Sequence, residues 1–157
     1  MTDKPPPDHA NVIAFPPLIA VVFAFLGAIA FRFWPRPVAH PTIAHALAIV
    51  TAAGSISLAL WASRQLRRAG TTIDPHGSST AIVTTGPYAF SRNPLYVAVG
   101  LLLTSLGLGV NSLAILLTLI PWLLLMHFGV VLREERYLTA KFGTTYTSYQ
   151  QRVRRWL

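Results

Sequence analysis

The sequence predicts an all-α integral membrane protein, and three observations support this prediction. The first is composition: 53% of the 157 residues are hydrophobic and only 11% are charged, whereas soluble domains usually carry about 25% charged residues. The second is that the apolar residues come in long blocks rather than at amphipathic spacing, which is typical of membrane-spanning segments. The third is a strong asymmetry in the distribution of the basic residues along the chain.

Four apolar blocks are expected to form transmembrane helices. Each has about 17 to 23 residues, enough for a helix to cross a hydrocarbon core of about 30 Å. Backbone polar groups in lipid must bond within the protein, so helices are expected for all four. The blocks cover residues 12–34, 43–63, 94–110 and 112–132. The preceding residues 1–11 are polar and rich in proline, which predicts a disordered tail before a single membrane domain, residues 12–157.

The third and fourth helices are expected to form a tight antiparallel hairpin, because only the tetrapeptide GVNS is available between them. Pro121 lies near the middle of the fourth helix and is expected to kink it. After the fourth helix, the segment 133–157 breaks at Gly143. Beyond this break an aromatic face predicts an interfacial amphipathic helix, with that face toward lipid or protein. The residues of this face are Tyr146, Tyr149, Val153 and Trp156.

Most of the basic residues lie on one side of this four-helix topology. Only Arg32 and Arg36 fall on the other side. Because cytoplasmic loops carry an excess of Lys and Arg, both termini and the 64–93 loop are expected in the cytoplasm. The basic residues of the cytoplasmic side are Lys4, Arg64, Arg67, Arg68, Arg92, Arg133, Arg136, Lys141, Arg152, Arg154 and Arg155.

The net charge of +8 does not indicate binding of nucleic acid. The basic residues lie beside apolar blocks and no nucleic-acid motif is present, so anionic lipid headgroups are the expected partner. The chain has no cysteine, which excludes disulfides, thiolate metal sites and a cysteine nucleophile. No spacing of histidines resembles a metal site, so no metal is expected. The oligomeric state is left open.

The stretch TTGPYAFSRNPLY, residues 84–96, is the first candidate for chemistry. Each of its residues has an ordinary explanation: Asn93 suits an N-cap, Pro94 suits the first helical position, and Arg92 and Tyr96 suit a membrane interface. In combination they describe a helix N-terminus with free backbone donors beside a guanidinium group. Such an arrangement forms an anion site.

The acidic candidates are Glu134 and Glu135, which directly follow the fourth helix. They either pair with Arg133 and Arg136 at a solvated helix end, or bind a ligand on a helix that continues to about Phe142. With the anion site, such an acidic site would suit a zwitterion that carries a carboxylate, ribose hydroxyls and a positive centre.

His127 is the third candidate. In a continuous α-helix, His127 and Glu134 lie within about 20° of one another on the same face. A polar residue inside a membrane helix is a functional hypothesis by default. A core histidine bonded to a backbone carbonyl is the alternative, and the sequence leaves both open.

These motifs resemble the integral-membrane isoprenylcysteine carboxyl methyltransferase and phospholipid methyltransferase group. The matching pattern is TTGPYAFSRNPLY, then a helical hairpin, then EERYLTAKFGTTYTSYQQRVRR. It covers residues 82–156, about half of the chain, in the order and spacing of that group. Three positions differ from the usual pattern: Asn93 replaces a histidine of the prenylcysteine enzymes, Ala98 a glycine and Arg154 a proline.

The resemblance implies that S-adenosyl-L-methionine binds at the cytoplasmic face, between the third and fourth helices and the C-terminal segment. It implies three groups of cofactor-binding residues. These are Arg92, Asn93, Pro94 and Tyr96 for the methionine part, Glu134 and Glu135 for the adenosyl and sulfonium side, and Gly86, Pro87 and Tyr88 for a loop that closes over the cofactor.

The expected function is therefore S-adenosylmethionine-dependent methyl transfer to an amphiphilic acceptor, in the manner of an isoprenylcysteine carboxyl methyltransferase. A carboxylate acceptor needs no base, whereas an amine acceptor must lose a proton. The catalytic candidates are Arg92, Glu134 and His127. Two alternatives remain open. One is a lipid-amine or small-thiol methyltransferase of the same fold, and the other is a non-catalytic membrane protein in which the charged residues only anchor helix ends.

Overall fold

The computed structural model describes residues 9–72, 74 and 77–157, and this part of the chain is helical. An isolated parallel bridge between Ser91 and Arg154 is the only β pairing within it. Residues 1–8 of the expected tail fall outside the described residues. The elements in chain order are α1 (Pro16–Phe33), α2 (Pro41–Arg68), the 3₁₀ turn η1 (Gly86–Ala89), α3 (Pro94–Gly109), α4 (Leu113–Leu117), α5 (Leu119–Met126), the π turn η2 (His127–Val131), α6 (Leu132–Phe142) and α7 (Thr144–Arg152).

Three helical segments of the described chain are long and apolar enough to cross a membrane: Pro16–Phe33, Pro41–Arg68 and Leu113–Phe142. A fourth apolar helix, Pro94–Gly109, is shorter. The outer surface of the bundle is apolar as well, since Ile49 is 71% exposed and Phe25 is 66% exposed. Large apolar side chains on the outside are what lipid contact requires. The all-helical membrane class is confirmed, whereas four crossings remain a prediction.

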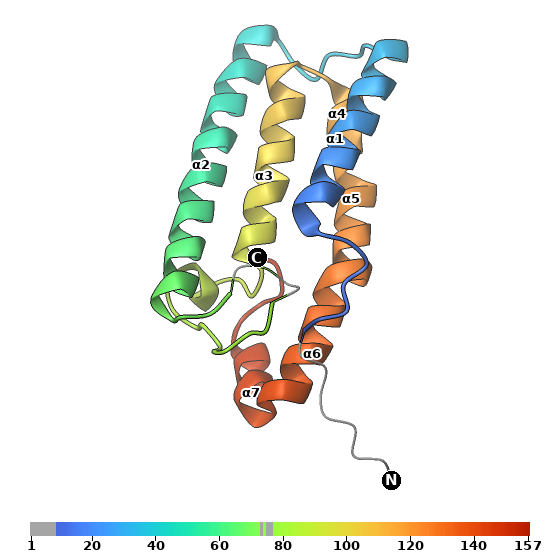
Figure 1. The fold of residues 1–157 in the computed structure, drawn as a ribbon. Coiled ribbons are helices and arrows are strands. Elements are labelled where there is room, and N and C mark those ends of the chain that lie inside the picture. Colours follow the sequence, from blue (N-terminus) through green and yellow to red (C-terminus); the bar gives the residue numbers. More distant parts are fainter. Residues whose placement is uncertain (1–8, 73, 75–76) are drawn as a thin grey trace.

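The helices form a bundle around α3 (Figure 1). Helix α2 packs along α3, and α1 packs against α3, α4 and α5. The hairpin expected between the third and fourth helices is present, with α3 against α4 and α5 across a turn at Asn111. Because α3 runs antiparallel to the segment from α4 to α6, the polar start of α3 lies at the same end of the bundle as α6 and α7.

The expected fourth helix is interrupted twice. Pro121 has no N–H to donate to Leu117, and the α-helical pattern breaks at Thr118, between α4 and α5. The π turn at His127–Val131 is a second irregularity, which no residue of the sequence signals. A π turn shifts the helical register by about one residue. The shared face expected for His127 and Glu134 is therefore wrong, because that expectation assumed an uninterrupted α-helix.

Helix α1 begins at Pro16, four residues later than expected, because Pro16 and Pro17 suit the first helical turn. The residues before it pack against the rest of the protein. Ala10 is 1% exposed, and the Ile13 N–H donates to the Gly129 carbonyl within the π turn. Arg133 donates to the Asn11 carbonyl at 2.9 Å. Residues 10–13 thus connect the start of α1 to the π turn and α6 through these hydrogen bonds.

The segment after Gly143 differs from the single amphipathic helix expected there. Helix α7 ends at Arg152, and the backbone becomes extended at Val153. Trp156 therefore does not continue the aromatic face of α7. The two residues that remain on that face, Tyr146 and Tyr149, are both buried and turn toward protein. The extended residues 153–157 run beside residues 91–93 instead.

Candidate active site

The approach to α3 begins with a glycine turn that the surrounding packing requires. Gly86 has φ +62°, and a Cβ at this position would lie 2.9 Å from Gln65 Cγ and 3.0 Å from Trp61 Nε1. Only glycine combines this backbone conformation with such close approach to α2. The turn leads into η1, where Tyr88 is buried and its carbonyl accepts a hydrogen bond of 2.7 Å from Tyr149 Oη.

Arg92 and Asn93 are held by the extended residues 153–157. The Arg92 N–H donates to the Arg154 carbonyl at 2.9 Å, and Asn93 Nδ2 donates to the Arg155 carbonyl at 2.8 Å. Helix α3 begins at Pro94 as expected, but the Asn93 side chain makes no capping hydrogen bond. Asn93 therefore occupies the N-cap position as expected, but its side-chain amide binds the C-terminal segment instead of capping the helix.

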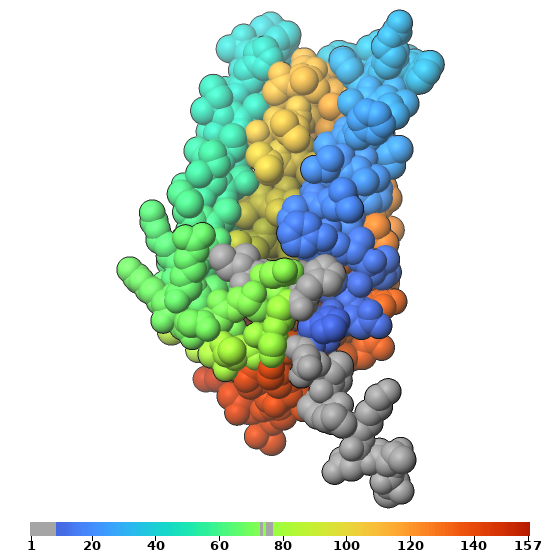
Figure 2. Space-filling view, viewed as in Figure 1, coloured from blue at the N-terminus to red at the C-terminus, as the bar shows by residue number. Residues whose placement is uncertain are grey.

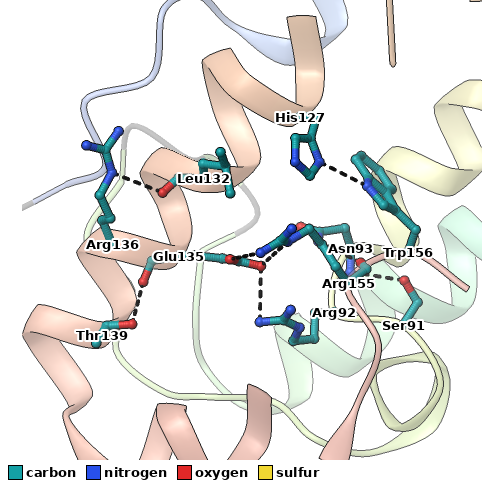
Figure 3. A network of polar contacts seen from close by, with 10 residues as sticks. All are labelled: Ser91, Arg92, Asn93, His127, Leu132, Glu135, Arg136, Thr139, Arg155 and Trp156. Carbon is teal, nitrogen blue, oxygen red and sulfur yellow. Dashed lines mark hydrogen bonds and ion pairs between the residues drawn. The ribbon is translucent and has the colours of Figure 1, made fainter. Parts of the chain in front are cut away.

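Three charged side chains meet beside the start of α3 (Figure 3). Both carboxylate oxygens of Glu135 accept hydrogen bonds from Arg155, with distances of 2.8 Å from Nε to Oε1 and 2.9 Å from Nη2 to Oε2. Arg92 Nη1 lies 3.0 Å from the same Oε1. The cationic and acidic sides of the expected pocket are therefore in contact with one another rather than facing each other across a gap.

Arg92 nevertheless retains unused donors. Its side chain is only 9% exposed, and its contact with Glu135 is an ion pair without hydrogen-bond geometry. Within the described part of the chain, neither Nε nor Nη1 of Arg92 has a hydrogen-bond acceptor. A buried donor without an acceptor costs about 1–3 kcal/mol, and more for a charged group. Because Arg92 lines both polar cavities described below, water or a ligand in these cavities could supply the acceptor.

Glu134 faces a different partner from Glu135. Tyr96 Oη donates to Glu134 Oε1 at 2.6 Å, a short hydrogen bond between α3 and α6. The two glutamates thus have separate roles in the geometry: Glu135 binds the arginines, and Glu134 binds a tyrosine of the neighbouring helix.

Two adjoining polar cavities lie at this end of the bundle, with volumes of about 130 and 110 Å³. Both are lined by Tyr88, Arg92, Asn93 and Glu134. Pro94 and Tyr96 line the first, and Glu135 lines the second. Of the residues expected to bind a cofactor, only Gly86 and Pro87 are outside these linings, and they directly precede Tyr88 in η1.

An apolar chamber of about 380 Å³ adjoins the first polar cavity. The two share Asp74, Leu95 and Tyr96, so the chamber and the polar cavity meet at the start of α3. Figure 2 shows the corresponding hollow between α1 and α2, with α3 as its floor. The other residues of its wall are Phe15, Pro16, Pro17, Ser55, Ala59, Ala98, Val99 and Leu102.

His127 does not join this group. It lies at the start of the π turn, and its Nδ1 accepts a hydrogen bond of 3.3 Å from Trp156 Nε1. It also packs edge-on against Phe128, with ring centroids 4.8 Å apart. His127 is absent from the linings of the two polar cavities. A neutral imidazole that accepts at Nδ1 carries its proton on Nε2.

Sequence reasoning missed the contributions of Tyr146, Tyr149 and Arg155. Both tyrosines line the second cavity. Burial, and then the charge of Glu135, raises the pKa of Tyr146 to about 12, so its hydroxyl stays protonated at neutral pH. Their position in the FGTTYTSY motif was the available signal. No signal marked Arg155, because its importance depends on the extended backbone after α7.

The fold and this site define a class: a helical membrane protein with a buried polar cavity at one end of the bundle, next to an apolar chamber. The family model described as phospholipid methyltransferase matches residues 43–145, which include the start of α3, both glutamates and the hairpin. The chain belongs to the phospholipid methyltransferase family, and the resemblance found in the sequence is confirmed.

Two curated relatives match shorter stretches. An uncharacterized protein of Haemophilus influenzae is 51% identical over 57 residues, which are 36% of this chain and 87% of that protein. The cobalt-zinc-cadmium resistance protein CzcN of Cupriavidus metallidurans is 38% identical over 64 residues, which are 41% of this chain but 30% of the relative. No solved structure matches the chain significantly.

Proposed function

We propose that the protein transfers a methyl group from S-adenosyl-L-methionine to an amphiphilic acceptor at the cytoplasmic membrane face. Membership of the phospholipid methyltransferase family supports a membrane methyltransferase. The observation on which the proposal rests is the junction of a polar cavity containing the unsatisfied Arg92 with an apolar chamber. A cofactor with a carboxylate and an acceptor with an apolar tail suit these two compartments.

The residues of the polar cavity fit the cofactor. Nε and Nη1 of Arg92 would donate to the carboxylate of the cofactor, beside the positive end of the α3 dipole. Glu134 and Tyr96 would serve the positive or hydroxyl-bearing part of the ligand. The bound cofactor supplies an electrophilic methyl carbon: the acceptor's lone pair forms the new bond, and the electrons of the broken carbon–sulfur bond return to sulfur.

The protein's own contribution is mainly to position the acceptor and to exclude water. Tyr96 and Leu95 belong to both compartments, so an acceptor headgroup at the junction would have its tail among Ala59, Val99 and Leu102. Holding the reacting atoms about 3–3.5 Å apart in a dry pocket accounts for much of the acceleration in such displacements. A small soluble thiol has no apolar tail to fill this chamber, so it is the less suitable acceptor.

A lipid amine is the second candidate acceptor, and the acids at the junction favour it. Glu134 lines the polar cavity, and Asp74 lines both the cavity and the chamber. An amine that gains a methyl group must lose a proton, and Glu134 is within the cavity to accept it. His127, whose Nδ1 is engaged by Trp156, is outside the cavity linings and is the weaker base candidate.

Transfer of tritiated methyl groups to acceptors reconstituted in lipid vesicles tests this function. We expect label in the lipid phase with prenylcysteine or lipid-amine acceptors and none with short-chain thiols. Ala59→Leu should raise the acceptor KM by narrowing the chamber, whereas Ala53→Leu, at an exposed position of α2, should not. The absence of transfer to every amphiphile by folded protein would favour the non-catalytic alternative.

A further inference from the structure

We propose that Arg155 is a positioning residue, which neutralises Glu135 so that Arg92 remains available for the anionic part of the ligand. This inference rests on the cofactor site proposed above, and it assigns a role to a residue outside the linings of both polar cavities. It also gives a reason for the extended residues 153–157 to run beside the start of α3.

The two arginines share the carboxylate of Glu135 unequally. Arg155 takes both oxygens in a side-on pair, at 2.8 and 2.9 Å. Arg92 approaches only Oε1, at 3.0 Å and without hydrogen-bond geometry. Bidentate arginine–carboxylate pairs are the strong form of this interaction. Glu135 is therefore satisfied mainly by Arg155, as Figure 3 shows.

The cluster of Arg92, Glu135 and Arg155 carries a net positive charge. Two guanidinium groups and one carboxylate leave one positive charge, and the more buried guanidinium, that of Arg92, has the unused donors. Without Arg155, the cluster would become a neutral pair in which Arg92 turns to Glu135 for two hydrogen bonds. The cluster of Arg92, Glu135 and Arg155 would then lose its net positive charge and Arg92 its free donors, and an incoming carboxylate would have to displace Glu135.

The position of Arg155 in the fold depends on its backbone and its neighbours rather than on its own side chain. The backbone on one side of it accepts from Arg92 N–H at 2.9 Å, and its own carbonyl accepts from Asn93 Nδ2 at 2.8 Å. On the other side, Trp156 donates to His127. Replacing the side chain of Arg155 should therefore leave the 153–157 segment in place, which makes the electrostatic role separable from the structural one.

Calorimetric titration of S-adenosylhomocysteine into the detergent-purified full chain tests the proposal. Arg155→Met should weaken binding about 10- to 100-fold, the range expected when hydrogen bonds to a charged group are lost. Arg152→Met, which removes an equal charge from an exposed position on α7, should change it by less than about threefold. Combining Arg155→Met with Glu135→Gln should restore affinity to near that of Glu135→Gln alone, since Arg92 is again unpaired.

The double variant separates the two possible roles of Arg155. If Arg155 only stabilises the fold, the double variant binds no better than Arg155→Met, and the proposal is overturned. Unchanged affinity in Arg155→Met overturns it as well.

A second measurement is independent of the ligand. The Nε–H resonance of Arg92, assigned with Arg92→Lys in ¹H–¹⁵N spectra, should shift downfield in Arg155→Met as this group gains an acceptor. If the wild type binds no S-adenosylhomocysteine, the cofactor proposal fails, and this resonance alone decides the role of Arg155. An unshifted resonance would contradict that role.

Discussion

The hydrogen bond between Tyr96 and Glu134 provides a quantitative test of the site's geometry. Tyr96→Phe removes a donor that lies 2.6 Å from the carboxylate and leaves the rest of the ring in place. A hydrogen bond to a charged group contributes about 1.5–3 kcal/mol, compared with about 0.5–1.5 kcal/mol for a neutral pair. At an alkaline pH where Glu134 is ionised, we therefore expect Tyr96→Phe to lower the free energy of unfolding by about 1.5–3 kcal/mol.

Tyr149→Phe is the matched control, because it removes a tyrosine donor of similar length, 2.7 Å, from a neutral acceptor, the Tyr88 carbonyl. It should cost about 0.5–1.5 kcal/mol. The free energies can be measured by titration with sodium dodecyl sulfate in mixed micelles, followed by circular dichroism. A double-mutant cycle of Tyr96→Phe with Glu134→Gln should show coupling well above 0.5 kcal/mol. Additive effects, together with a cost no greater than that of Tyr149→Phe, would refute the pairing.

Two further predictions concern the turn before the site and the orientation of the chain. Gly86→Ala and Gly70→Ala both force alanine into a left-handed backbone conformation, which lowers the free energy of unfolding by about 1–2 kcal/mol each. Only at Gly86 does the new methyl group also meet α2, at 2.9 Å from Gln65 Cγ. The same detergent titration should therefore show a larger loss for Gly86→Ala, and equal losses would contradict the close approach. For orientation, single cysteines can be added because the chain has none. In intact cells an impermeant maleimide should label Thr42→Cys but not Thr145→Cys until the membrane is opened, and the reverse pattern would overturn the cytoplasmic assignment.

The architecture could largely be predicted from the sequence because lipid imposes simple rules. Apolar block length and the requirement for internal backbone bonding predict helices, and the short GVNS connection predicts the hairpin. The start of α3 at Pro94 follows from the geometry of proline at a first helical position. These features depend on local chemistry, which a single sequence records directly.

The finer geometry could not be predicted, because it depends on contacts between distant segments. The π turn at His127–Val131 changes the register of the helix that holds both glutamates, and neither composition nor spacing signals it. Asn93 has the residue type of an N-cap but bonds to Arg155, 62 positions away. The same non-local segment determines how Glu135 is divided between two arginines. The sequence therefore indicated which residues would gather at the start of α3, whereas their hydrogen-bond partners could be found only from the fold.

The central claim is that the cavity at the start of α3 binds S-adenosylmethionine. Its most direct test compares the binding of tritiated cofactor by the wild-type protein, Arg92→Ala and Arg64→Ala. Arg64 is an exposed arginine near the end of α2 and controls for loss of a positive charge at the same end of the bundle. The account predicts saturable binding that S-adenosylhomocysteine displaces, at least tenfold weaker in Arg92→Ala and nearly unchanged in Arg64→Ala. Folded wild-type protein without saturable binding, or equal binding by Arg92→Ala, would contradict it.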